Sequence, residues 1–405
     1  MINVDSTIHD LEVLTAARAA KLLGVKRETL YAYVSRGMLR RVQPVGKRVS
    51  GYVLADVMRL RARANARKGH AAVASGALRW GEPVLETAIA GIGARGPLYR
   101  GRWAVDLANE GVSFERVAEL LWTGELPSAT PRWTPSPPPS KAKALAALTA
   151  RASIPVRLQV LVAALAAEHS PIFGASELLE RDRARALVAR MASLLGDAHG
   201  PSVAATFARA LGLRETAASA VDVALVLVAD HELNASSFAA RIAAGAGCDL
   251  HACINAALAT ASGSNHGGEC DRVEALMLQG RAARLVRERA ARGERISGFG
   301  HTLYPKGDPR ATPLLALARS ISKRSAAPFD EVADTMQGEL GFAPTIDFGL
   351  VALTAALGAP AGSAVGLFVL GRSAGWVAHV QEQRRADFLL RPRARYIGPS
   401  PIADP

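Results

Sequence analysis

Two segments in the C-terminal half of this 405-residue chain place a histidine among glycines, where its side chain could take part in acid–base chemistry. The first, GSNHGGECDRVEALML at residues 263–278, puts His266 just before an amphipathic helical pattern. A ring at the start of a helix experiences the positive end of the helix dipole, so we expect His266 to stay neutral at pH 7. A neutral imidazole can donate a hydrogen bond to an oxygen on which negative charge develops. The flanking glycines indicate close approach of a ligand.

The second segment, SGFGHTLYPKGDPRA at residues 297–311, contains His301, Lys306 and Arg310. Its glycines let the backbone fold tightly, and Asp308 before a proline is typical of a helix start. The segment therefore predicts a compact loop that presents a histidine and a cation together.

Asp347 and Arg372 follow at the two ends of a strongly apolar stretch. Desolvation beside such a stretch raises the basicity of a carboxylate, and arginine can bind a carboxylate of a ligand through a bidentate fork. Carbon–carbon bond formation from a thioester needs a base, a donor for the enolate oxygen, a donor for the acceptor carbonyl and cations for the acceptor's carboxylates. This half of the chain offers a candidate for each role.

The run GFGH followed by DPR resembles the signature of citrate synthases, and the resemblance extends over about residues 84–400. It is carried further by the segments TAIAGIGARGPLYRGRWAVDLANEG, VADHELNASSFAARIAAG, PTIDFGLVAL, GRSAGWVAHVQEQ and RPRARYIGP. The chain departs from the family at Glu269 and Cys270, where Ala-Asn is common, and at Pro305, where a cation is usual.

The resemblance implies a role for each matched side chain. Asp347 would remove the methyl proton of an acyl-CoA, His266 would stabilise the enol, and His301 would polarise and protonate the ketone of oxaloacetate. Oxaloacetate would be bound by His231, Arg310 and Arg372. Arg391, with Arg393 as the alternative, would reach in from the partner subunit of a homodimer. Lys306 would contact CoA.

The first 70 residues carry 14 lysines and arginines against 5 acids, most of the chain's net charge of +13. TAARAAKLLG and KRETLYAYVS predict two short helices joined by a tight turn, and the glycines and proline that follow predict a β-hairpin wing. This order resembles the DNA-binding segment of MerR-type regulators. The implied contacts to double-stranded DNA are Lys26, Arg27, Thr29 and Tyr31 in the major groove, and Arg40, Lys47 and Arg48 on phosphates. The alternative is a packing module with these cations on a solvated face.

The sequence thus predicts an all-α, citrate-synthase-like fold with a large and a small domain, preceded by a small winged helix-turn-helix. The expected bounds are 1–68 for the helix-turn-helix, 69–80 for a linker, and 81–405 for the remainder, with the small subdomain at about 265–372. Phe348 to Gly371 is uncharged but is interrupted by Gly358, Pro360 and Gly362, which favours two buried helices over a membrane span.

Three functions are compatible with these residues. They are an acyltransferase that makes citrate or 2-methylcitrate, a metabolite-sensing DNA-binding regulator without turnover, and a lyase that cleaves citryl-CoA. The motifs indicate neither a metal site nor a nucleotide-binding loop. No bound cofactor is expected, because the CoA thioester is itself a substrate. A cytoplasmic location is expected, because the first residues lack the apolar core of a signal peptide.

Overall fold

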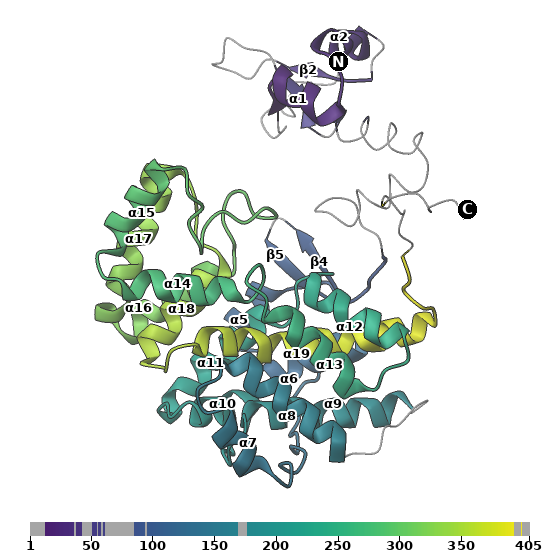
Figure 1. Cartoon of the computed structure of the whole chain (residues 1–405), viewed down its shortest axis with the longest axis vertical. Coiled ribbons are helices and arrows are strands. Elements are labelled where there is room, and N and C mark those ends of the chain that lie inside the picture. Colours follow the sequence, from purple (N-terminus) through teal and green to yellow (C-terminus); the bar gives the residue numbers. More distant parts are fainter. Residues whose placement is uncertain are drawn as a thin grey trace, which may run out of the picture. The chain divides into compact units, whose positions relative to one another are not determined.

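The computed structural model describes residues 13–35, 38–42, 51–54, 56–57, 60, 85–93, 95–168, 176–392 and 398. The chain divides into two compact units, Met1–Glu86 and Thr87–Pro405 (Figure 1). The linker expected at 69–80 lies outside the described residues. Among the residues that are described, no helix has the length and apolar character needed to cross a membrane.

The first unit contains two short helices and a small antiparallel sheet. Its elements are β1 (Val13–Leu14), α1 (Ala16–Leu23), α2 (Arg27–Ser35), β2 (Arg41–Val42) and β3 (Gly51–Val53), with strand order β1-β3-β2. Thr15 is the N-cap of α1, since its Oγ1 accepts a hydrogen bond from the Arg18 N–H, and Gly24 ends the helix in the left-handed region. The helices and sheet enclose a small apolar core of Ala19, Ala20, Leu30, Leu39, Tyr52, Val57 and Leu60. The sequence also favours an Arg-rich helix from Leu54 to Arg67, and most of that range lies outside the described residues.

The second unit is mostly helical, as predicted, but it begins with a sheet that the all-α expectation missed. Its elements are β4 (Ala90–Gly93), β5 (Gly96–Tyr99), β6 (Arg102–Trp103), α5 (Ala104–Asn109), α6 (Phe114–Thr123), α7 (Ala142–Leu148), α8 (Ile154–Glu168), α9 (Glu177–Ala192), α10 (Val203–Ala210), the 3-10 turn η1 (Glu215–Ala217), α11 (Ala218–Val228), α12 (Ala235–Gly245), α13 (Leu250–Ala261), α14 (Gly268–Leu278), α15 (Ala282–Ala291), α16 (Ala311–Ile321), α17 (Lys323–Leu340), α18 (Ile346–Leu357) and α19 (Ser363–Ala386).

The antiparallel sheet β4-β5-β6 escapes prediction because its strands are short and rich in glycine, which is typical of a turn. β4 and β5 pair from Ala90↔Tyr99 to Gly93↔Gly96. The sheet is anchored by Tyr99, whose buried hydroxyl lies 3.2 Å from the carbonyl oxygen of Leu227 and 3.1 Å from that of Asp230. The sheet therefore fixes the chain just beyond the end of α11.

The uncharged stretch forms two helices, as predicted. α18 ends at Gly358 in the left-handed region, and α19 begins after Gly362. Every residue of α19 from Ser363 to Val380 is buried, which is typical of a helix in the centre of a bundle. In Figure 1 this helix runs through the middle of the second unit, with α11, α12 and α13 beside it and the group α14–α18 toward one end.

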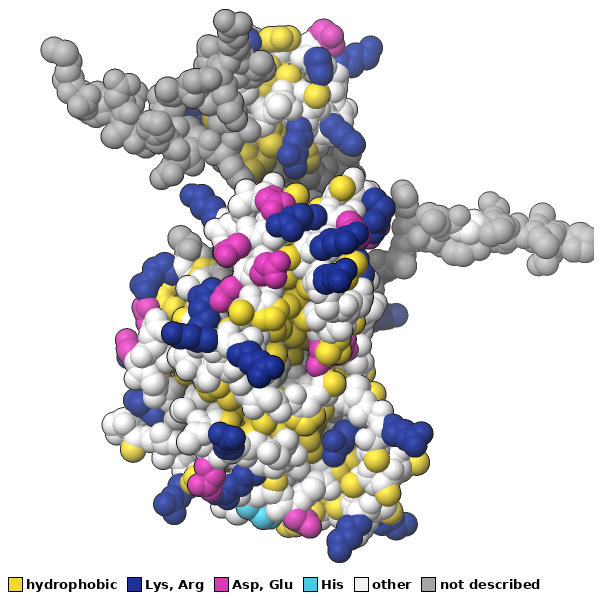
Figure 2. Space-filling model, turned by 90° about the vertical axis from the view of Figure 1, so that its left-hand side faces the viewer, with side chains coloured by type: hydrophobic (Ala, Val, Ile, Leu, Met, Phe, Trp, Pro, Cys, Tyr) yellow, Lys and Arg dark blue, Asp and Glu magenta, His cyan; other side chains and the backbone are white. Residues whose placement is uncertain are grey.

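The charges on α15 and α17 are paired on the surface. Arg287 meets Glu339 across the two helices, while Arg284 pairs with Glu288 within α15. Figure 2 looks at the side that carries these helices and shows basic and acidic side chains interleaved there. This side therefore presents no extended field of one sign among the described residues.

Two glycines let α19 approach α11 closely. A Cβ added at Gly371 would collide with Val228 and would lie 2.8 Å from the carbonyl oxygen of Leu225. A Cβ added at Gly375 would lie 2.6 Å from the carbonyl oxygen of Ala229. Because these distances are far below van der Waals contact, any side chain there would push the helices apart.

We therefore expect Gly375→Ala to lower the free energy of unfolding by about 1 to 3 kcal/mol, the usual cost of overpacking. The matched control is Gly338→Ala in α17, where an added Cβ meets nothing within 4 Å and should stabilise the helix by about 0.5 to 1 kcal/mol. Guanidinium unfolding midpoints measure both effects. Equal stability of Gly375→Ala and the wild-type chain would contradict the close packing of α19.

Candidate active site

His266 lies in the turn that leads into α14, and two other helices fix its ring. Its Nε2 is 2.9 Å from the hydroxyl oxygen of Ser236 on α12, and the indole N–H of Trp376 on α19 donates to that same oxygen at 3.0 Å. Ser236 is fully buried beside Asn234, the N-cap of α12. Helices α12 and α19 therefore orient the ring from one side.

The expected neutrality of His266 is supported, but by causes that differ from the predicted one. Burial, followed by the charge of Arg372, lowers the pKa of His266 to about 4. The ring is therefore neutral at pH 7 because its surroundings are dry and cationic.

The tautomer of His266 depends on the single proton of the Ser236 hydroxyl. That hydroxyl can donate to His266 Nε2 at 2.9 Å or to Asn234 Oδ1 at 2.7 Å, and Asn234 Oδ1 already accepts the backbone N–H groups of Ser236 and Ser237. When Ser236 donates to Nε2, the ring proton is on Nδ1. Sequence patterns identify neither Ser236 nor Trp376, because both reach the site from distant helices.

His301 lies in the loop before α16, and its neighbours also define a tautomer. The backbone N–H of Leu303 donates to His301 Nδ1 at 3.1 Å, so the proton of the neutral ring is on Nε2. Burial and the charge of Arg310 lower the pKa of this histidine. His301 is therefore a neutral donor through Nε2.

His231 lies next to His301 in a third loop, between α11 and α12. The two rings have centroids 5.6 Å apart, and the Nε2 of His231 is 2.8 Å from the hydroxyl oxygen of Tyr304. Burial, then the charges of Arg310 and Arg372, hold the pKa of His231 well below its ordinary value. Tyr304 belongs to the same motif as His301 but was not among the predicted site residues.

Arg310 brings a positive charge into the interior. It is 2% exposed and is held by Asp308, whose oxygens accept from its Nε at 2.9 Å and Nη2 at 2.8 Å. Its Nη1 has no hydrogen-bond partner among the described residues. Burial alone would lower the pKa of Arg310, but the carboxylate of Asp308 outweighs burial and raises it.

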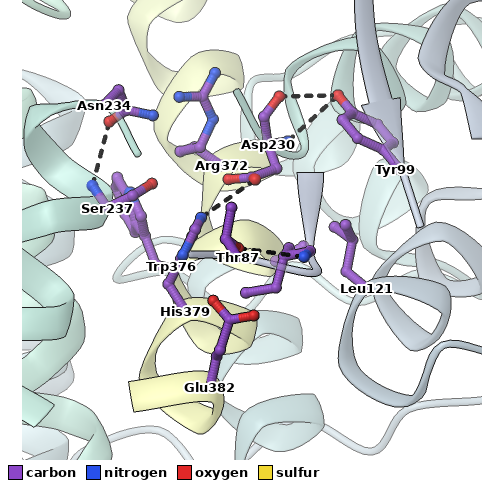
Figure 3. Close-up of polar contacts among 12 residues, drawn as sticks. Thr87, Tyr99, Leu121, Asp230, Asn234, Ser237, Arg372, Trp376, His379 and Glu382 are labelled. Atoms are coloured by element: carbon purple, nitrogen blue, oxygen red, sulfur yellow. Dashed lines mark hydrogen bonds and ion pairs between the residues drawn. The ribbon is translucent and has the colours of Figure 1, made fainter. Parts of the chain in front are cut away.

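Arg372 is also 2% exposed and donates through Nε to the carbonyl oxygen of Val228 at 2.7 Å, at the end of α11. Burial lowers the pKa of Arg372, and the nearby carboxylate of Asp230 opposes that effect. Asp230 itself is buried, with Oδ2 3.3 Å from His379 Nε2 (Figure 3). A second buried cation thus lies where α11, α12 and α19 meet.

Asp347 lies in the first turn of α18 and has one donor for each carboxylate oxygen. The thiol of Cys270 is 3.3 Å from Oδ1 and the hydroxyl of Thr345 is 3.3 Å from Oδ2. Burial raises the pKa of Asp347. The carboxylate is therefore a stronger base than an exposed aspartate, as the sequence predicted from its apolar surroundings.

The structure brings most of the predicted set together. The charges of Arg310, Arg372, His301 and His266 all act on His231, and the charges of Arg310 and Asp347 both act on Arg372. Two other predicted residues are exposed.

Lys306 is exposed in its loop, and Arg391 is exposed in the segment after α19. Arg393 lies outside the described residues. The contacts predicted for these cations, with CoA and across a dimer, therefore stay predictions.

The predicted groove contacts of the first unit lie at the start of α2. Lys26, Arg27 and Tyr31 are exposed there, and Thr29 is half-buried. An exposed basic helix start remains available to a ligand of opposite charge.

The predicted phosphate contacts of the first unit are Arg40, Lys47 and Arg48. Arg40 forms a bidentate pair with Asp56 through Nε at 2.8 Å and Nη2 at 3.1 Å. The Arg40 side chain is 56% exposed in this pair, and its contact with phosphate stays a prediction. Lys47 and Arg48 lie outside the described residues.

Comparison with known proteins connects this geometry to relatives. Residues 77–393 match the family model described as citrate synthase, C-terminal domain. A relative from Mycobacterium tuberculosis, "Putative citrate synthase 2", is 31% identical over 75% of this chain and 87% of its own length. "2-methylcitrate synthase 1" of Corynebacterium glutamicum is 30% identical over 74% of this chain and 88% of its own.

A solved structure shares the fold. It is the ternary complex of citrate synthase from Thermoplasma acidophilum with carboxymethyl coenzyme A and oxaloacetate. It matches with a TM-score of 0.72 and 24% identity over 80% of this chain and 96% of that chain. The family model spans the histidines, the two buried arginines and the aspartate described above, and the chain therefore belongs to the citrate synthase family.

Proposed function

We propose that this enzyme of the citrate synthase family condenses acetyl-CoA with oxaloacetate to give citrate and CoA. The observation that carries the proposal is a group formed by two buried arginines, three histidines with lowered pKa values and an aspartate with a raised one. A base and neutral donors beside buried cations suit the condensation of a thioester with a dicarboxylic oxo acid. The completeness of this set favours an enzyme over a regulator without turnover.

Asp347 and His266 act on the thioester in this proposal. Asp347 takes a proton from the methyl carbon of acetyl-CoA, and the Nδ1–H of His266 donates to the thioester oxygen as the enol forms. This step needs the tautomer in which the Ser236 hydroxyl donates to His266 Nε2 at 2.9 Å. A neutral donor that is already oriented stabilises the developing charge without reorganising during the reaction.

Oxaloacetate is held by the cations. Arg310, through its unpartnered Nη1, and Arg372 bind the carboxylates, with His231 beside them. His301 donates from Nε2 to the ketone oxygen. The new bond joins the methyl carbon to the ketone carbon, the ketone oxygen takes the His301 proton, and water then cleaves the thioester to release CoA.

The choice of acyl group is open between acetyl and propionyl. The relatives include proteins named as citrate and as 2-methylcitrate synthases at nearly the same identity. One methylene in an apolar pocket changes discrimination by only about 1 to 3 kcal/mol. We propose acetyl-CoA as the main substrate and propionyl-CoA as an alternative one.

Asp347→Asn and His266→Ala should each lower the rate of condensation by about 10² to 10⁴-fold while leaving the fold intact, because base and enol donor act together. Release of the CoA thiol, measured with acetyl-CoA and propionyl-CoA in the presence of oxaloacetate, gives the rates. Asp182→Asn and His199→Ala are matched controls at exposed positions. A variant of Asp347 or His266 that kept more than about a tenth of the rate would contradict its role.

We also propose that the enzyme is a homodimer in which Arg391 completes the partner's site. Its position in the exposed segment after α19 suits a residue that reaches outside its own subunit. A hybrid dimer tests this, formed from one subunit with Arg391→Ala and one with Asp347→Asn. If Arg391 acts across the interface, each hybrid contains one complete site.

Mixing these two inactive variants after unfolding and refolding together should then restore about a quarter of the wild-type activity, because half of the dimers are hybrids with one site of two. Each variant refolded alone is the control. No restoration on mixing, with hybrids verified by mass, would place Arg391 in its own subunit's site or in none.

A second candidate function is binding of double-stranded DNA by the first unit. The supporting observation is the exposed start of α2, where Lys26 and Arg27 are adjacent and Tyr31 is 55% exposed. The guanidinium of Arg41 lies 5.7 Å from the ring centre of Tyr31, so a further cation borders the same surface. A basic helix start of this kind suits phosphate and groove contacts.

Replacing Lys26 and Arg27 together by Ala should weaken DNA binding and make it less sensitive to salt. The slope of log K against log salt should fall by about 0.9 for each phosphate that is no longer neutralised, or about 2 for each chain. Gel-shift titrations over a genomic fragment library at several salt concentrations provide the measurement. The matched control replaces Lys323 and Arg324, an exposed adjacent pair at the start of α17. Absence of salt-dependent binding to any duplex would leave the first unit as a packing module.

A further inference from the structure

Cys270 contacts the carboxylate of Asp347 from a neighbouring helix. It is the third residue of α14, it is 1% exposed, and its sulfur lies 3.3 Å from Asp347 Oδ1. Thr345 supplies the donor for the other oxygen, Oδ2, at 3.3 Å. A carboxylate with one donor on each oxygen has a defined orientation.

We propose that Cys270 is a positioning residue, whose thiol holds the carboxylate of Asp347 toward the thioester and sets its strength as a base. The proposal rests on the proposed function, in which Asp347 removes the methyl proton. It also gives a role to a position at which the motif around His266 departs from the common family pattern.

A thiol suits this role because it is a weak donor that stays protonated. Burial, followed by the charge of Asp347, raises the pKa of Cys270 well above its ordinary value, so the S–H bond persists across the working pH range. A weak hydrogen bond fixes the oxygen but stabilises the anion less than a hydroxyl or amide would. The carboxylate is thereby oriented while much of its raised basicity is kept.

The first turn of α14 is itself anchored, which keeps the thiol in place. Glu269, the residue before Cys270, accepts the backbone N–H of Gly298 at 3.0 Å and pairs with Arg272 and Arg295. These contacts tie the start of α14 to the loop that carries His301. Movement of Cys270 away from Asp347 would therefore disturb several hydrogen bonds.

Charges on several elements act on Asp347, and a neutral substitution of Cys270 leaves them all unchanged. The carboxylates of Glu269 on α14 and Asp308 before α16 raise the pKa of Asp347. The guanidinium groups of Arg310 before α16 and Arg372 on α19 lower it. The hydrogen bond from Cys270 lowers the pKa of Asp347. Removal of this hydrogen bond should therefore raise the pKa of Asp347 further.

The contact is tested without any activity by Raman spectroscopy of the S–H stretch in the full-length chain. Cys248→Ala and Cys253→Ala in the same chain leave Cys270 as the remaining thiol. Adding Asp347→Asn removes the anionic acceptor and should shift the S–H band to the higher frequency of a weaker hydrogen bond. An unshifted band would overturn the proposal.

The catalytic consequence is tested by the pH profile of kcat/KM. The base must be ionised, so kcat/KM falls tenfold for each pH unit below its pKa. Cys270→Ala should move the acidic limb of the profile to higher pH by about one unit. Because one pH unit corresponds to a tenfold change in ionisation, kcat/KM on that limb should fall about tenfold. Cys270→Ser keeps a donor and should leave the limb at or below its wild-type position.

Cys253→Ala and Cys253→Ser are the matched controls, because Cys253 is an equally buried cysteine on α13. They should leave the limb unchanged. If Cys270→Ala lowers thermal stability but leaves the acidic limb in place, Cys270 only fills space and the proposal is wrong. Failure of the proposed function would look different, because the wild-type chain would then release no thiol from either acyl-CoA while the Raman shift could still be measured.

Discussion

Burial of two guanidinium groups in an apolar helical core constrains most of the candidate site. An unpaired buried charge is very costly, so each group needs a partner from the protein. Asp308 holds Arg310 through two hydrogen bonds, and the carbonyl of Val228 with the nearby Asp230 serves Arg372. The partners of Arg372 lie on a distant segment of the chain, so this arginine can be accommodated only when α11 and α19 are correctly packed.

Burial, and then the same two charges, determine the protonation of their neighbours. Together with burial, they lower the pKa of His231, and each acts likewise on one further ring, Arg372 on His266 and Arg310 on His301. Neutral rings can donate to an oxygen that becomes negative, while the arginines provide the fixed positive charge for an anionic ligand. In this arrangement the histidines donate hydrogen bonds, and the arginines compensate the negative charge of the ligand.

Structural features that depend on adjacent residues can be predicted from local sequence patterns. Features that depend on contacts between distant segments cannot. The ends of α1 and of α18 were predictable because helix capping depends on a few neighbouring residues. The predicted catalytic and substrate-binding residues were recognisable because each lies in a short motif. Ser236 was not predictable, since its contact with His266 joins segments 30 residues apart. The ion pair of Arg40 with Asp56 was not predictable either, because it joins segments 16 residues apart. The sheet β4–β6 was missed because its strands are short, and Tyr99 joins it to the end of α11 through contacts that are distant in sequence.

The site also keeps polar groups that the fold does not satisfy. Among the described residues, Arg310 Nη1, Asp230 Oδ1, Asn234 Nδ2 and Ser237 Oγ are buried without a hydrogen-bond partner. Three of these residues, Asp230, Asn234 and Ser237, lie near Arg372 (Figure 3). An unsatisfied buried polar group costs about 1 to 3 kcal/mol, so a core selected only for stability would eliminate such groups. Their retention is consistent with groups arranged for a ligand, because a dicarboxylic oxo acid would bring the acceptors that the Arg310 and Asn234 donors lack.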